Sequence, residues 1–219
     1  MKPLAIDLFC GLGGWAEGML AEGWDVVGFD IERHHYPDHG LGPYPSQLVL
    51  QDILTLHGSQ FRDAALIVAS PPCQAYSYRA MPWSRAKALP PPDNSLFEAC
   101  FRIQREAIEA AGRHIPLVVE NVRGAQKWVG RARWNYGSYF LWGDVPAIMP
   151  SAGARNFTRV AGAQAADGIK QGGTWWHDEG SISRATGSKS SARKAASARI
   201  AKIPPMLARH IARVFKPSS

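Results

Sequence analysis

Short apolar runs, broken by glycine, proline and acidic residues, recur through the first two thirds of this chain of 219 residues. Runs of this kind that are rich in β-branched side chains are typical of buried strands. We expect strands over 3–9, 25–30, 47–50, 65–69 and 115–119, and a hairpin or edge strand over 133–142. The first four end at or near a polar residue: Asp7, Asp30, Asp52 and Ser70.

Helical periodicity fills the gaps between several of these runs. Residues 15–22 predict one helix, and residues 95–111 predict a second that keeps one face apolar. The second begins with a capping-box sequence, Ser95-Leu96-Phe97-Glu98, and ends before Gly112. An amphipathic stretch over 204–214 predicts a helix that packs back on the sheet. Because strands alternate with helices, we expect an α/β fold with a Rossmann-like, doubly wound and mainly parallel sheet.

Composition changes after Pro150, where glycine, alanine and serine increase and large aliphatic residues become rare. We therefore divide the chain into a main domain over 1–150, a short basic region over 151–203 and a C-terminal helix within 204–219. Within the basic region, the segment 181–199 is expected to bury little core and to stay mobile until it meets a partner.

The net charge of +7 is concentrated at the C-terminal end. Residues 1–150 hold 13 Lys and Arg against 15 Asp and Glu, a balance of −2, whereas residues 151–219 hold 12 against 3, a balance of +9. A neutral body joined to a basic segment is typical of polyanion-binding proteins. A solvated basic tail without a partner is the alternative.

Cysteine usage and the N-terminus bear on the compartment. The three cysteines, Cys10, Cys73 and Cys100, lack the spacing of a disulfide framework or of a zinc site. Asp7 comes too early for the core of a signal peptide, and no apolar stretch is long enough to span a membrane. We expect a soluble cytoplasmic protein without a metal ion.

Two segments carry candidate chemistry. The loop Gly11-Leu12-Gly13-Gly14-Trp15-Ala16 fits the pattern G-x-G-x-x-A, and Asp30 follows at a distance suited to binding a ribose. This loop serves a nicotinamide cofactor and S-adenosylmethionine equally well. Cys73 follows the apolar run 65–69 and two prolines, which places a thiol at a sheet edge as a candidate nucleophile. A buried, unreactive thiol is the alternative there, and Cys100 on the helical stripe is interpreted as core.

Three ordered blocks resemble the cytosine-5 DNA methyltransferases: Asp7-Leu8-Phe9-Cys10-Gly11-Leu12-Gly13-Gly14, then Pro71-Pro72-Cys73-Gln74-Ala75-Tyr76-Ser77, then Glu120-Asn121-Val122. The resemblance covers residues 1 to about 143 and implies a methyltransferase of the S-adenosylmethionine-dependent type. Arg131-Ala132-Arg133 is similar to the family's R-x-R element, although Val129 stands where glutamine is usual.

The resemblance implies a DNA (cytosine-5-)-methyltransferase in which Cys73 attacks C6 of a flipped cytosine. Glu120 is expected at N3 of the base and Arg133 at O2, with Arg131 in support, because negative charge develops on the ring. Burial at a strand end favours the protonated form of Glu120. The group that removes the C5 proton is not identified.

S-adenosylmethionine is the implied cofactor, with Phe9 and the glycine loop around its methionine part. Asp30 is expected to bind the ribose, Ile31 to pack on the adenine, and Asp52 with Ile53 to contact the adenine. The full set of expected cofactor-binding residues is Asp7, Phe9, Gly11, Leu12, Gly13, Gly14, Asp30, Ile31, Asp52, Ile53 and Pro72. As an alternative, Asp52 only caps a helix. The family's C-terminal Gly-Asn-x-Val segment is replaced by Ala201-Lys202-Ile203-Pro204, which lacks the asparagine.

Double-stranded DNA is the expected partner, and the protein is expected to be a monomer. The loop 74–92 has the aromatic and basic side chains to close over DNA: Tyr76, Tyr78, Arg79, Trp83, Arg85 and Lys87. The basic region, in which Trp175, Trp176 and His177 are the most distinctive side chains, is short. We therefore expect a short or relaxed recognition sequence and salt-dependent binding. The small size suggests a phage or mobile-element enzyme.

Three other functions compete with this one. The same chemistry could act on RNA, shortening could have left a catalytically silent DNA-binding relative, and the glycine loop alone would suit a nicotinamide oxidoreductase.

Overall fold

The computed structural model describes residues 2–79, 84–150 and 191–217, and within them seven strands form a single sheet of order β3-β2-β1-β4-β5-β7-β6. The strands are β1 (Leu4–Leu8), β2 (Asp25–Asp30), β3 (Gln47–Leu50), β4 (Leu66–Ala69), β5 (Leu117–Asn121), β6 (Trp134–Tyr136) and β7 (Tyr139–Gly143). Every neighbouring pair from β3 to β5 is parallel, and β7 runs antiparallel to both β5 and β6. The expected α/β fold and the β6–β7 hairpin are confirmed.

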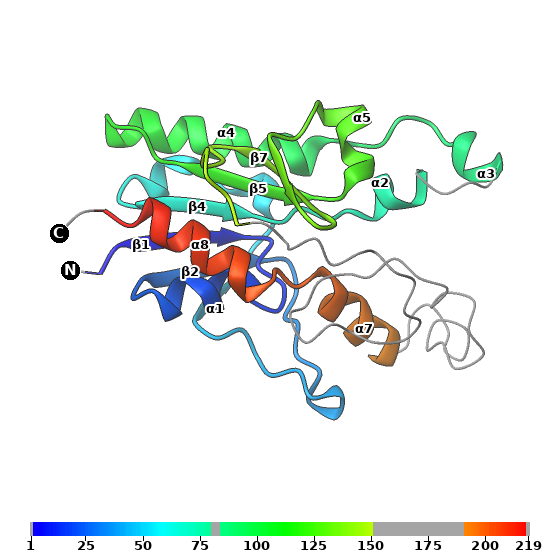
Figure 1. The fold of residues 1–219 in the computed structure, drawn as a ribbon, viewed down its shortest axis with the longest axis horizontal. Helices are drawn as coiled ribbons and strands as arrows, with labels where there is room; N and C mark the ends of the chain where they lie inside the picture. Colours follow the sequence, from blue (N-terminus) through cyan, green and yellow to red (C-terminus); the bar gives the residue numbers. More distant parts are fainter. Residues whose placement is uncertain (1, 80–83, 151–190, 218–219) are drawn as a thin grey trace.

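Helices cover both faces of the sheet (Figure 1). One face carries α1 (Gly14–Ala21) and α8 (Pro205–Phe215), and the other carries α4 (Ser95–Ala111) with the short 3-10 helices η2 (Ile53–Thr55) and η3 (Gly58–Phe61). The remaining described helices are η1 (Pro37–His39), α2 (Gln74–Arg79), α3 (Ser84–Lys87), η4 (Arg123–Ala125), α5 (Gln126–Val129) and α7 (Ser191–Ala201).

Successive residues along the apolar strands pack alternately into the two cores, one on each face of the sheet. In β4, Ile67 and Ala69 belong to the α4 core, whereas Leu66 and Val68 belong to the α1 and α8 core. All four are fully buried. A strand covered on both faces needs apolar side chains at every position, which explains the continuous apolar runs of the sequence.

The start of α4 differs from the predicted capping box. Ser95 is the first residue inside the helix rather than its N-cap, and its N–H donates to Asp93 Oδ1 at 2.8 Å. The aspartate two residues earlier therefore satisfies a free N–H of the first turn. Gly112 ends the helix at φ +64° as predicted, and Cys100 is fully buried on the expected apolar face.

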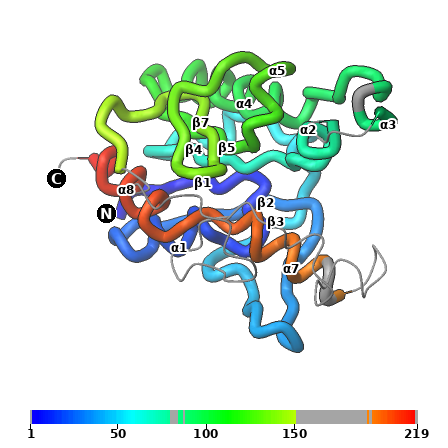
Figure 2. Tube along the Cα trace, turned by 45° about the vertical axis from the view of Figure 1, so that its right-hand side comes forward, coloured from blue at the N-terminus to red at the C-terminus, as the bar shows by residue number. Residues whose placement is uncertain are grey.

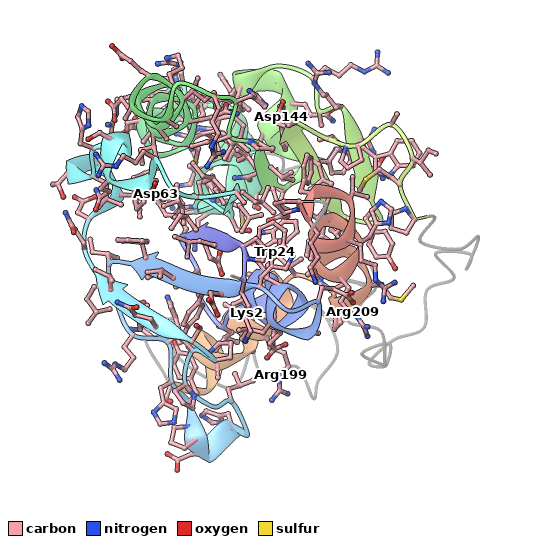
Figure 3. The ribbon with its side chains drawn as sticks, turned by 90° about the vertical axis from the view of Figure 1, so that its left-hand side faces the viewer. Lys2, Trp24, Asp63, Asp144, Arg199 and Arg209 are labelled. Carbon is pink, nitrogen blue, oxygen red and sulfur yellow. The ribbon has the colours of Figure 1, made fainter. Side chains whose placement is uncertain are left out.

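The helix α8 packs closely along α1. Gly18 permits the approach, since a Cβ placed on it would lie 2.3 Å from the Cβ of Ala208. The indole N–H of Trp24 donates to the carbonyl of Ala212 at 3.2 Å (Figure 3). The C-terminal helix is thus tied to the sheet through buried contacts.

Ion pairs reinforce the same contact at the surface. The Glu22 carboxylate lies 2.6 Å from Arg209 Nε and 2.9 Å from Arg213 Nη2. Hydrogen bonds from Arg213 and Arg209 lower the pKa of Glu22 to about 2. Exposed pairs of this kind contribute little free energy individually, so the buried contacts carry most of the stabilisation.

The segment 181–199, which was expected to bury little core, contains most of a helix in its described part. Residues 191–201 form α7, in which Ala195 is 3% exposed, and the following Ile203 is also buried. Alanine, lysine and arginine favour a helix, and the rest of the protein supplies the surface against which it packs. Figure 2 shows α7 leading into α8 along the side that carries α1. Residues 181–190, like the rest of 151–190, lie outside the described residues.

Candidate active site

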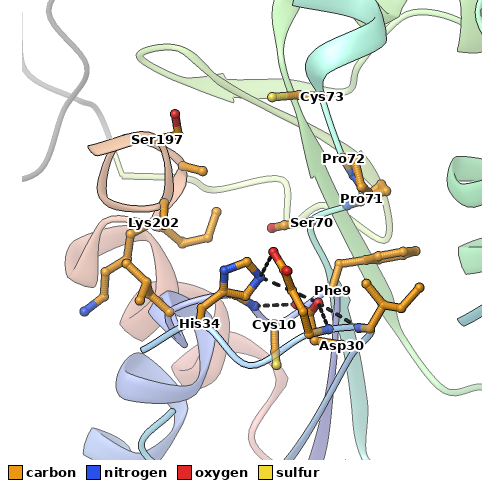
Figure 4. A pocket seen from close by; sticks show the side chains of 18 of the residues that line it. Phe9, Cys10, Asp30, His34, Ser70, Pro71, Pro72, Cys73, Ser197 and Lys202 are labelled. Carbon is orange, nitrogen blue, oxygen red and sulfur yellow. Dashed lines mark hydrogen bonds and ion pairs between the residues drawn. The ribbon is translucent and has the colours of Figure 1, made fainter. Parts of the chain in front are cut away.

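A cavity of about 480 Å³ lies at the carboxyl edge of the parallel strands (Figure 4). Its walls come from the segments that follow β1, β2 and β4, from the end of β5, and from α7 and the residues after it. Parallel strands bring residues distant in sequence together at this edge, where ligands of α/β proteins commonly bind. The volume falls within the roughly 300–1,000 Å³ usual for small-molecule and cofactor sites.

Cys73 lines this cavity and is half-buried. The loop that carries it is held at two points: Asn121 Nδ2 donates to the carbonyl of Pro71 at 2.9 Å, and Trp15 Nε1 donates to Ser70 Oγ at 3.0 Å. Prolines also restrict the loop's backbone. A stiff loop thus presents the thiol at the cavity, which contrasts with the buried-thiol alternative.

Glu120 lines the same cavity as Cys73. The sequence placed the end of its strand at Val119, but β5 continues to Asn121 because antiparallel pairing with β7 extends that far. Glu120 therefore lies within the strand, opposite Leu141, and is 7% exposed. The structure brings the predicted nucleophile and the predicted acid to one site.

The glycine loop has open space only at its beginning. Gly11 adopts φ +50°, a Cβ on it would meet nothing within 4 Å, and its N–H donates to Asp30 Oδ2 at 2.9 Å. By contrast, a Cβ on Gly13 would lie 2.5 Å from a side-chain carbon of Pro45, and one on Gly14 would lie 2.5 Å from the backbone of the C-terminal segment. Gly11 and Gly14 line the cavity and Gly13 does not.

Phe9, Leu12 and Pro72 also line the cavity, but Asp7 does not. Phe9 adopts φ +56°, and within the described residues it is the one non-glycine residue with positive φ. This conformation costs on the order of 1–3 kcal/mol and is common at functional sites. Asp7 is fully buried behind the loop, where its Oδ2 accepts a hydrogen bond from Tyr44 Oη at 3.1 Å. Burial raises the pKa of Asp7.

Asp30 ends β2 at the cavity, and its carboxylate is surrounded by donors. Oδ1 accepts from the N–H groups of Ile31 at 2.8 Å and Glu32 at 3.3 Å, and it lies 3.7 Å from His34 Nε2. Burial opposes ionisation, but the interactions with His34 and with the N–H of Gly11 outweigh it and lower the pKa of Asp30. An ionised carboxylate at this place can accept hydrogen bonds from a bound ligand.

Ile31, Asp52 and Ile53 line the cavity near Asp30. Ile31 is 73% exposed, whereas Ile53 is 3% exposed and belongs to the core. Asp52 also caps η2, because its Oδ1 accepts from the N–H of Leu54 at 2.9 Å. Asp52 therefore caps a helix, as the alternative expected, and it also lines the cavity.

Arg131 and Arg133 are exposed, and neither lines the cavity. They lie between α5 and β6, on a segment that Gln126 braces by accepting the N–H of Ala132 at 3.2 Å through Oε1. A glutamine thus does contact the backbone of the R-x-R segment. It is Gln126, which stands three positions before Val129, the position at which the family usually has its glutamine.

Some cavity residues were missed by the sequence reasoning. His34 and Tyr36 line the cavity beside Asp30, and they carry no motif. The helix α7 contributes Lys194, Ser197, Ala198 and Ala201, which are spaced i, i+3, i+4 and i+7. This helical spacing is present in the sequence, but these residues are not strongly hydrophobic, so a search for apolar periodicity does not reveal it. Of the loop 74–92, residues 80–83 and the Lys87 side chain lie outside what the structure describes, as does the segment 175–177.

The mainly parallel seven-stranded sheet, with β7 antiparallel, is the Rossmann-like α/β fold that was expected of an S-adenosylmethionine-dependent methyltransferase. The chain belongs to the C-5 cytosine-specific DNA methylase family, whose family model matches residues 4–128. No curated protein sequence matches the chain.

Solved structures similar to the chain include S. pombe Dnmt2 methyltransferase, with 18% identity over 59% of this chain and a TM-score of 0.40. A putative DNA modification methyltransferase encoded within an E. coli prophage shows 22% identity over 59% and a TM-score of 0.39. Entamoeba histolytica methyltransferase EhMeth shows 16% identity over 59% and a TM-score of 0.39. The chain spans 37%, 35% and 41% of these proteins, respectively.

S-adenosylmethionine is the cofactor of this family, and the cavity fits it. The ionised Asp30 carboxylate can accept from ribose hydroxyls, and the open space at Gly11 lets a ligand approach the backbone. In the described part of the chain, no group of three or more His, Cys, Asp or Glu is placed to hold a metal ion. No helix there is long and apolar enough to cross a membrane.

Proposed function

We propose that this protein is a DNA (cytosine-5-)-methyltransferase that acts on a cytosine extruded from a DNA duplex. The observation that carries the proposal is the convergence of Cys73 and Glu120 on the cavity that also contains Asp30 and the glycine loop. A nucleophile, an acid and a cofactor site in one cavity are the parts that this reaction requires.

The thiolate of Cys73 adds to C6 of the cytosine, forming an S–C6 bond and converting the ring into an enamine. S-adenosylmethionine, when bound, would supply the methyl group for C5 and would leave as S-adenosylhomocysteine. Loss of the C5 proton to a base, which water can provide, then restores the C5–C6 double bond and expels the thiolate. The bracing of the Cys73 loop by Asn121 and Trp15 keeps the sulfur at the cavity through all three steps.

Glu120 supports the addition by sharing a proton with N3, which neutralises charge as it develops on the ring. Its burial keeps this interaction away from bulk water. Arg133, with Arg131 beside it, is proposed to reach O2 of the base from outside the cavity, as the base enters. Both arginines are exposed and therefore accessible to an incoming polyanion.

Duplex DNA is the proposed substrate and the protein is proposed to act as a monomer in the cytoplasm of a bacterial or phage-infected cell. The positive charge of residues 151–219 supports binding to phosphates, which predicts strong salt dependence and a short or relaxed recognition sequence.

The test is transfer of a radiolabelled methyl group to duplex DNA and, in parallel, to transfer RNA. We expect label in duplex DNA as 5-methylcytosine. Label in RNA alone would replace the proposal with the RNA alternative. If neither nucleic acid is labelled while DNA is still bound, the protein is the catalytically silent relative.

Affinity for the cofactor is expected to rise with pH above about 6.5 and then to level off. The protonated ring of His34 pairs with Asp30, and this pairing raises the pKa of His34, although burial opposes the rise. Glu32, Tyr36 and Lys194 also face the ring. The ribose needs the same carboxylate, so the charged ring competes with it until pH exceeds the raised pKa. Asp30, with its lowered pKa, stays ionised throughout.

Calorimetric titration of S-adenosylhomocysteine across neutral and mildly alkaline pH measures this. His34→Gln should make the profile flat over the same range. An unchanged rise in that variant would assign the pH dependence to another group.

A further inference from the structure

The helix α7 presents one face to the cavity, and three of its four lining side chains there are small. Lys194, Ser197, Ala198 and Ala201 lie on one helical face, and Lys202 and Ile203 continue the wall beyond the helix. Figure 4 shows Ser197 and Lys202 across the cavity from Phe9 and Pro72. Small residues along this face leave the cavity its volume, since a larger side chain there would fill it.

The C-terminal end of α7 is fastened at several points. Lys202 Nζ lies 2.6 Å from Glu17 Oε1, which directs the ammonium group toward α1. Arg199 Nη2 donates to the carbonyl of His39 at 2.6 Å, and the backbone of Ile203 packs against Gly14. The end of the helix is therefore held against α1, which begins at Gly14, and against η1.

The buried side chain of Tyr139 makes a hydrogen bond to the end of α7. Its hydroxyl lies 3.1 Å from the carbonyl of Lys202 and 3.3 Å from that of Ile200, and its single O–H donates to these two carbonyls as one three-centre hydrogen bond. These carbonyls belong to the end of α7, where helix carbonyls have no partner within the helix. The Tyr139 side chain is fully buried in the core that includes α1 and α8. A residue of strand β7 thus provides a hydrogen-bond donor for the carbonyl groups at the end of the helix.

Tyr139 also lies beside the catalytic side of the cavity. Glu120 pairs with Leu141, so Tyr139, two residues away on β7, shares the sheet face of Glu120 as a diagonal neighbour. One residue therefore adjoins both the proposed acid and the α7 wall.

We propose that α7 closes the cofactor cavity in place of the missing Gly-Asn-x-Val segment, and that Tyr139 is the positioning residue that sets the distance of this wall. The inference rests on the proposed function, because it takes the cofactor to be S-adenosylmethionine. It assigns a role in cofactor affinity to residues that carry no motif, and it separates this role from the chemistry of Cys73.

Calorimetric titration of the full chain with S-adenosylhomocysteine tests the inference without depending on catalysis. Tyr139→Phe should weaken binding about three- to tenfold, the effect of one lost hydrogen bond. Ala198→Leu, which fills the cavity from α7, should weaken binding more than about tenfold. Ala196→Leu on the same helix does not line the cavity and should bind within about twofold of wild type.

The outcomes distinguish the inference from the function on which it rests. Failure of the wild-type protein to bind S-adenosylhomocysteine would overturn both. Equal affinity in wild type, Tyr139→Phe and Ala198→Leu would overturn the inference alone. In steady-state methyl transfer, Tyr139→Phe should raise KM for the cofactor and leave kcat and the KM for DNA unchanged. A loss confined to kcat would mean that Tyr139 acts on Glu120 instead, which also contradicts the inference.

Discussion

Cys73→Ser is expected to lower methyl transfer by more than about a thousandfold, because a serine hydroxyl is a much weaker nucleophile than a thiolate. Trapping provides the sharper measurement. DNA that contains 5-fluorocytosine has no C5 proton to lose, so the wild-type protein should remain covalently attached after methyl transfer. Cys73→Ser should form no such adduct on a denaturing gel, and its affinity for S-adenosylhomocysteine should be unchanged.

Cys100→Ser is the matched control. Cys100 is fully buried in α4, away from the cavity, and its thiol donates to the carbonyl of Leu96 at 3.4 Å, a bond that a serine hydroxyl can also make. This variant should still form the adduct. An adduct that persists in Cys73→Ser would contradict the assignment of Cys73 as nucleophile.

Glu120→Gln is expected to reduce kcat by about 10²- to 10⁴-fold, the usual range for loss of a positioned acid. Glutamine has the same shape but cannot share a proton with N3, so charge on the ring is left uncompensated. Affinity for S-adenosylhomocysteine should stay near the wild-type value, because Glu120 is proposed to contact the base rather than the cofactor. Single-turnover methyl transfer at saturating DNA separates the chemical step from binding.

Glu98→Gln serves as the control, since Glu98 lies on the exposed side of α4 and does not line the cavity. Its kcat should equal that of the wild type. A Glu120→Gln variant that keeps full kcat but loses cofactor affinity would move Glu120 from the base to the cofactor.

Much of the sheet could be predicted from the sequence. The apolar run before Cys73 is fully buried in β4, because a strand covered by helices on both faces selects apolar residues at each position. The end of β5 was placed too early, at Val119. Pairing with β7 extends the strand to Asn121, and such pairing partners are absent from local sequence.

The candidate site was also partly predictable, since Cys73, Glu120 and Asp30 stand in motifs that local sequence displays. His34 and Tyr36 stand in none, and they reach the cavity only through the path of the chain after β2. The assignment of Asp7 to the cofactor remains a prediction, and its full burial behind the loop leaves it no place on the cavity wall.

By itself, the sequence determined the strands, the glycine loop, the order of the motif blocks and the identity of the thiol and the carboxyl groups. These features depend on neighbouring residues, whose spacing and side-chain types are written directly in the chain. Only the tertiary structure decided that α7 lines the cavity, that Tyr139 donates a hydrogen bond to the end of this wall and that Arg131 and Arg133 lie outside the cavity. Such contacts join residues far apart in the chain, so they arise from packing rather than from local preference.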